Sequence, residues 1–200
     1  MKLKHWEIAL IITVVITIVC GCFLNVEANA LSDKLIRLHV VANSDTEADQ
    51  ALKLQVRDAV LSELETLLDG ARGKDEAQEI VENNLSRLTA RAEETIRDNG
   101  YDYSAQATLC SEIFPTTEYG TFSLPAGVYT SLRIKIGEAA GHNWWCVVFP
   151  PVCTSPGLED VSATVGLTEG QVSLITAETG EYKVKFKALE LLGELKALFS

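Results

Sequence analysis

The sequence has little of what nucleic-acid binding and most enzyme chemistry require. Its 200 residues include 17 basic and 28 acidic side chains, for a net charge of −11, and only three histidines. Binding to phosphates or to an anionic membrane surface needs a basic face, which this acidic excess would oppose, so we expect no nucleic-acid partner. The glycine-rich phosphate loops and the G-x-S-x-G nucleophile motif are missing as well.

The first thirty residues have the pattern of an export leader. Two lysines precede an apolar run over residues 8–20, and the segment ends with Ala28-Asn29-Ala30, which is an A-x-A cleavage site. This pattern predicts a signal peptide that comprises residues 1–30 and is cut after its last alanine.

Two alternatives to cleavage remain open. The mainly apolar run over residues 8–24 is at the short limit for crossing a bilayer, so it could serve as an uncleaved membrane anchor. Lipid attachment at Cys22 is the other option. In each case residues 31–200 are predicted to form a single exported domain, which meets the membrane only through the N-terminal segment and only if that segment is uncleaved.

Metal-ligand spacing is missing from the exported part. Zinc sites favour close pairs such as C-x2-4-C, whereas six residues separate Cys146 from Cys153 and the histidines are scattered. We therefore expect neither a metal nor a cofactor. The enzyme alternative is an exported thiol-dependent hydrolase with Cys146 as nucleophile and His142 as base. In an extended strand these two side chains lie about 13 Å apart, so such a site needs the loop over residues 141–143 to curl.

The cysteines are better candidates for a disulfide. Two of the five fall in the leader, which leaves Cys110, Cys146 and Cys153 in a compartment that allows disulfides. Cys146 with Cys153 is the preferred pair, because Pro150-Pro151 can reverse the chain between them. Closing so short a loop would stabilise the fold by about 2.5 kcal/mol. A Cys110–Cys146 pair across neighbouring strands competes with it, and three buried thiols are the plain alternative.

The stretch from Gly127 to Cys153 is predicted to supply the core of a sheet. Residues 128–136 alternate along the chain in the pattern of a half-buried strand. Residues 144–149 are nearly all apolar, which favours a strand buried on both faces. The connection over residues 137–143 predicts a hairpin loop that pairs the two strands.

A strand and two helices are predicted before this stretch. Residues 34–41 form a strand that ends at a turn, in which Asp45 is the candidate N-cap of a helix. Apolar residues then recur with the helical period over residues 46–67 and again over residues 75–98. The two helices are predicted to form a hairpin packed on one face of a mainly antiparallel sheet, which is a two-layer α+β fold.

Two aromatic features are candidate partner-binding groups. Residues 115–126 form a long connection with two prolines, and its Tyr119 and Phe122 are typical contact residues. Trp144 and Trp145 are adjacent in a predicted strand, so they should face opposite sides, and tryptophan is a frequent interface anchor. The alternatives are structural: the loop folds back as a lid on the core, and both tryptophans are buried.

The chain after Cys153 is predicted to end in a second hairpin and a short helix. Residues 171–177 and 182–187 flank a turn segment that contains a glycine. Leucines recur at every third position within residues 188–199, which predicts a terminal helix.

Four segments of the chain resemble one known family, stage II sporulation protein R. They cover most of the predicted exported part, and an NWWC followed by FPPxC is too particular a combination to arise from composition. The segments are LIRLHVVANSD at residues 35–45, FPTTEYG at 114–120, LPAGVY at 124–129 and NWWCVVFPPVC at 143–153.

The resemblance implies an intercellular signal of endospore-forming bacteria. Members of this family are made in the forespore and secreted into the space between the two membranes. They are needed there to activate a membrane-bound aspartic protease, which processes the pro-form of sigma factor E in the mother cell. The resemblance implies no catalytic residue, so we expect a signalling protein and not an enzyme. The thiol-dependent hydrolase and an envelope-associated structural domain are the alternatives.

Overall fold

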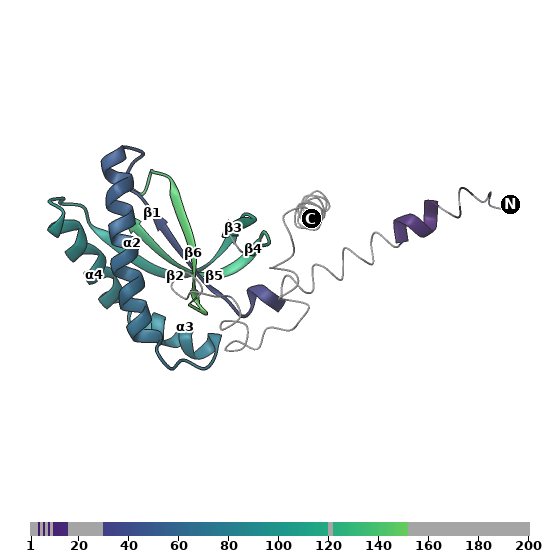
Figure 1. The fold of residues 1–200 in the computed structure, drawn as a ribbon, viewed down its shortest axis with the longest axis horizontal. Helices are drawn as coiled ribbons and strands as arrows, with labels where there is room; N and C mark the ends of the chain where they lie inside the picture. The colour runs from purple at the N-terminus through teal and green to yellow at the C-terminus, as the bar shows by residue number, and fades with distance from the viewer. Residues whose placement is uncertain are drawn as a thin grey trace. The chain divides into compact units, whose positions relative to one another are not determined.

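The computed structural model describes residues 4, 6, 8, 10–15, 30–119 and 122–151 (Figure 1). The described residues belong to two compact units, one of which contains residues 32–112 and 128–151, and the other residues 113–127 and the N-terminal segment. In the part of the chain so described, no helix is long and apolar enough to cross a membrane. The predicted C-terminal hairpin and helix lie outside the described residues, and the predictions of the leader and of a single exported domain stay predictions.

A four-stranded sheet forms the centre of the first unit. The strands lie in the order β2-β5-β1-β6, so β1 and β5 are central and β2 and β6 are the outer members among the described strands (Figure 1). β1 pairs with β5 in parallel and with β6 antiparallel, which makes a mixed but mainly antiparallel sheet. The strands span Ile36–Val41 (β1), Ala105–Phe114 (β2), Gly127–Ile136 (β5) and Asn143–Phe149 (β6).

The predicted hairpin between β5 and β6 is wrong, because β1 lies between the two strands. The loop over residues 137–143 passes across the end of β1 instead of turning directly back. Its Ala140 amide donates to the Asn43 carbonyl at 3.1 Å, and its Gly141 amide donates to the Ala42 carbonyl at 3.0 Å. Since parallel strands need a crossover connection, the helices that follow β1 in sequence carry the chain away before β5 can pair with it.

Three helices lie between β1 and β2, where the sequence predicted two. They are α2 (Glu47–Leu68), α3 (Lys74–Asn83) and α4 (Leu85–Asp98). The predicted second helix is interrupted at Asn84, whose φ of −114° and ψ of 12° are not helical. The Asn84 side-chain amide donates to the Ile80 carbonyl at 2.8 Å. Asparagine competes with the helix for backbone hydrogen bonds in this way, which accounts for the break.

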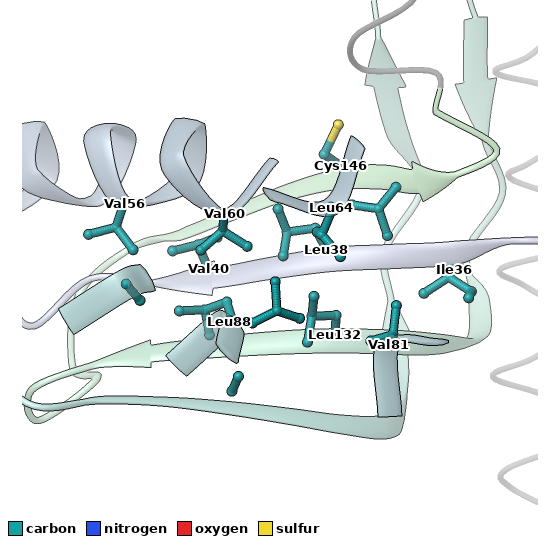
Figure 2. Packing of buried hydrophobic residues seen from close by; sticks show 14 of the residues in the cluster. Ile36, Leu38, Val40, Val56, Val60, Leu64, Val81, Leu88, Leu132 and Cys146 are labelled. Carbon is teal, nitrogen blue, oxygen red and sulfur yellow. The ribbon is translucent and has the colours of Figure 1, made fainter. Parts of the chain in front are cut away.

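The helices cover one face of the sheet, as the two-layer α+β prediction required (Figure 1). Figure 2 shows side chains of α2 pointing toward β1 and β6, with side chains of α3, α4 and β5 in the same cluster. Burying these apolar side chains is the main force that holds the two layers together. The cluster includes Ile36, Leu38, Val40, Val56, Val60, Leu64, Val81, Leu88, Leu132 and Cys146.

The turn between β1 and α2 differs from its prediction in one detail. Thr46, not Asp45, caps α2, since its hydroxyl accepts a hydrogen bond from the Asp49 amide at 3.2 Å. Asp45 instead accepts from the backbone amide of His142 at 2.6 Å and from the Nδ1 of the same residue at 2.5 Å. The Asp45 carboxylate therefore ties the β1–α2 turn to the β5–β6 loop.

The second unit contains a short β-hairpin where the sequence predicted a loop. Thr117–Tyr119 (β3) and Phe122–Leu124 (β4) pair antiparallel, with Tyr119 opposite Phe122. The prediction missed these strands because three residues are too few to display an alternating pattern.

Candidate partner-binding site

The two adjacent tryptophans of β6 face opposite sides of the sheet, as the strand geometry predicts. Trp144 packs against the core cluster on the helical side, and the Arg57 guanidinium of α2 lies 4.6 Å from the centre of its ring. Trp145 faces the other side, with its ring centre 6.1 Å from that of His39. Both tryptophans are half-buried, so each combines a packing role with an accessible edge.

The two aromatic residues of the β3–β4 hairpin form a stacked pair. The ring centres of Tyr119 and Phe122 lie 4.9 Å apart, with 18° between the ring planes. Phe122 is only 7% exposed, whereas Tyr119 is half-buried. Phe122 is therefore a buried packing residue, and Tyr119 is the member of the pair that a partner could contact directly.

A polar ladder crosses the sheet on the face opposite the helices, and sequence analysis did not predict it. It consists of Glu112 of β2, Arg133 of β5, His39 of β1 and Asn143 of β6. Arg133 Nη1 donates to Glu112 Oε1 at 2.9 Å, and His39 Nδ1 lies 3.1 Å from Glu112 Oε2. His39 Nε2 lies 2.8 Å from Asn143 Oδ1. Each strand of the sheet contributes one member, so the ladder links all four strands.

A second cation lies on the same face. Arg37 is buried in β1, and its guanidinium carbon lies 5.0 Å from the centre of the Tyr129 ring. Such contact between a guanidinium and an aromatic face stabilises a desolvated charge. This face of the sheet is therefore richer in basic groups than the chain as a whole, whose net charge is −11.

The ladder holds Glu112 in its ionised form. Burial works against the charged carboxylate, but hydrogen bonds from Ser131 and His39, together with the charges of His39 and Arg133, outweigh it and lower the pKa of Glu112. A carboxyl with a lowered folded-state pKa stabilises the fold above its unfolded pKa, and this stabilisation is lost as the pH falls through the folded value.

We expect Glu112→Gln to lower the free energy of unfolding by about 1–3 kcal/mol at pH 7, because charge-assisted bonds to Arg133 and His39 are lost. The difference from the native chain should begin to shrink as the pH falls below the ordinary glutamate pKa of about 4.3, where the unfolded chain takes up a proton, and it should disappear below the lowered folded-state pKa of Glu112. Urea unfolding at pH 7 and at pH 3.5 measures both values. Glu118→Gln, at an exposed position of β3, is the control. A difference that is unchanged at pH 3.5 would mean that charge is not the cause.

The structure does not bring together Cys146 and His142, the candidate nucleophile and base of the thiol-dependent hydrolase. Cys146 is 1% exposed and belongs to the core cluster under α2. The side chain of His142 is 78% exposed and is bonded to Asp45. A nucleophile needs contact with both its base and its substrate, and this arrangement gives Cys146 neither.

The competing disulfide between Cys110 and Cys146 is also wrong. Cys110 is a free cysteine on β2, and Cys146 is on β6, so two strands separate them. Cys153 lies outside the described residues, and its pairing with Cys146 stays a prediction. Within the described ranges no group of three or more histidine, cysteine or acidic side chains could hold a metal ion.

An apolar groove of about 590 Å³ lies between the C-terminal half of α2 and the end of β6. Its walls include Leu61, Leu64 and Leu68 from the helix and Phe149 from the strand. Sequence analysis could not have found it, because its two walls come from parts of the chain some eighty residues apart.

Comparison with known proteins identifies the family. A family model described as Stage II sporulation protein R (spore_II_R) matches residues 32–157, which is more than half of the chain. The chain belongs to the stage II sporulation protein R family. Stage II sporulation protein R of Bacillus subtilis (strain 168) is 39% identical over 123 residues, which are 62% of this chain and 55% of that protein. The match thus spans about half the length of this relative, and no solved structure matches the chain.

The region matched by the stage II sporulation protein R model contains the described residues of the four-stranded unit and also the β3–β4 hairpin. Residues 32–157 include β1, β5, β6 and the three helices, and also the four segments from which the resemblance was predicted. The resemblance to the stage II sporulation protein R family is therefore confirmed.

Proposed function

We propose that the chain is the exported signal that activates a membrane-bound aspartic protease, which then processes the pro-form of sigma factor E across the septum between forespore and mother cell. The observation that carries this proposal is the family match over residues 32–157. The packing of Cys146 in the core favours a non-enzymatic signal over the thiol-dependent hydrolase.

The proposed place of action is the space between the forespore and mother-cell membranes. The support is the leader pattern of residues 1–30, with its two lysines, its apolar run and its A-x-A site. A cleaved chain would diffuse in that space, whereas an uncleaved one would stay anchored by residues 8–24. In both cases the four-stranded unit faces the extracytoplasmic part of the protease.

The mechanism follows from the thermodynamics of binding. A ligand shifts its partner toward an active state only if it binds that state more tightly than the inactive one. Half-buried aromatic side chains supply such binding energy, because they present a large apolar area at low entropic cost. We propose that the contact groups are Tyr119 of the hairpin, with Phe122 stacked beneath it as a buried support, and Trp144 and Trp145 of β6.

The experiment is reconstitution in a host that has no sporulation genes. The protease and the pro-form of sigma factor E are expressed with or without this chain, and cleavage of the sigma factor is followed by immunoblot. We expect cleavage only when the chain is present and carries its leader. Cleavage without the chain, or with a leaderless version kept in the cytoplasm, would contradict the proposal.

We expect Tyr119→Ala to reduce the cleavage in this assay about tenfold or more, which is the loss typical of an interface hot spot. Phe122→Ala should have the same effect, since the pair is stacked. Tyr101→Ala is the matched control, because Tyr101 is stacked on Tyr103 with ring centres 5.3 Å apart and is also half-buried. Secretion and circular dichroism are measured for each variant. Normal cleavage with Tyr119→Ala would exclude the hairpin from the contact.

A further inference from the structure

The ring nitrogens of His39 both lie beside oxygen atoms. Nδ1 lies 3.1 Å from a carboxylate oxygen of Glu112, and Nε2 lies 2.8 Å from the amide oxygen of Asn143. An ionised carboxylate and an amide oxygen accept hydrogen bonds but cannot donate them. Both contacts can therefore be hydrogen bonds at the same time only when the ring carries two protons.

A neutral ring cannot keep this arrangement. It has one N–H, and the negative charge of Glu112 favours leaving that proton on Nδ1. The unprotonated Nε2 then faces the Asn143 oxygen, and two acceptors at hydrogen-bond distance repel one another. The contact is restored only if the Asn143 side chain turns over, so that its NH2 group donates to Nε2.

We propose that His39 and Asn143 form a proton-linked switch, in which the charge of the imidazole sets the orientation of the Asn143 amide at the first residue of β6. The same ring lies beside Trp145, so the switch extends into the β6 segment that carries both tryptophans. This inference concerns the folded chain alone and does not depend on the proposed function.

The other groups on this face determine how the switch responds to pH. The described charges are Glu112, which favours the imidazolium, and Arg37, Arg133 and Lys135, which oppose it by repulsion. Cys110 and Tyr129 also lie on these strands, but thiols and phenols titrate above the range in which an imidazole does. β6 contributes Asn143 and Trp145, neither of which titrates.

The test is nuclear magnetic resonance of the isotope-labelled chain between pH 5 and 8, in a His142→Gln background that removes the neighbouring imidazole. We expect the side-chain NH2 signals of Asn143 to shift with the same midpoint as the His39 ring. Glu112→Gln should lower that midpoint by about one pH unit, because the favourable charge is lost. Asn143→Asp, which keeps an acceptor oxygen beside Nε2 and adds a negative charge, should raise it by about as much.

His39→Gln is the decisive variant, since it should abolish the pH-dependent shift of the Asn143 signals. A shift that persists in this variant would overturn the proposal. So would Asn143 signals that stay constant while the His39 ring titrates. If His39→Gln does not fold, the comparison of midpoints in the His142→Gln background still decides the question, because that background leaves the ladder unchanged.

Discussion

Replacing Gly141 with alanine should lower the free energy of unfolding by about 3 kcal/mol, as overpacking against a rigid neighbour does. A Cβ at this position would lie closer than 3.0 Å to the backbone carbonyl of Ser44. Backbone atoms cannot move aside as the end of a side chain can, so the β5–β6 loop would have to lift from the end of β1. Lifting the loop also breaks the hydrogen bond from the Gly141 amide to Ala42.

Urea unfolding measures this loss, and Gly73→Ala is the matched control. No atom lies within 4 Å of the position where a Cβ of residue 73 would be. Gly73 is the N-cap of α3 and makes no capping hydrogen bond through a side chain. Its replacement by alanine should therefore lower the free energy of unfolding by about 1 kcal/mol or less. Equal losses for the two variants would show that the close approach to Ser44 is not what requires the glycine.

The contact at Gly141 also shows what the sequence could and could not predict. The pattern of apolar residues predicted β1, β5 and β6 as strands and α2 as a helix, because each pattern reflects the residues buried by one element. It did not predict that β1 would lie between β5 and β6, because alternation within a strand does not encode its neighbours. Strand order depends on contacts between residues some hundred positions apart.

The same limit applies to the candidate site. Trp144 and Trp145 were recognised from their residue type, and their opposite orientations follow from the period of a strand. The polar ladder was missed because it is defined by distance in space: Glu112 lies 73 positions from its partner His39. The only local signal in the sequence was Glu112, the single charged residue of β2. A glutamate is also common at exposed strand positions, so this signal did not indicate a ladder. The break at Asn84 was missed because the apolar period continues across it.

Among core substitutions, we expect Leu132→Ala to lower the free energy of unfolding the most, by about 3–4 kcal/mol. Leu132 is fully buried in the central strand β5, opposite Leu38 of β1, and belongs to the cluster that joins the sheet to the helices (Figure 2). Neighbours on both sides are held by sheet hydrogen bonds, so the cavity left by three missing carbon atoms cannot close.

Leu109→Ala is the control for this prediction, because Leu109 packs against the same cluster from the outer strand β2 but is only partly buried. Leu109→Ala should lower the free energy of unfolding by about 1 kcal/mol, because Leu109 buries less apolar area on folding than Leu132 does. Domains of this size are stable by only about 5–15 kcal/mol, so Leu132→Ala should also reduce the amount of chain that accumulates. Sigma-factor cleavage per folded molecule should stay unchanged, because Leu132 faces the helices and no partner can reach it. A variant that accumulates normally yet fails to signal would place Leu132 in the signalling contact and would contradict this assignment to the core.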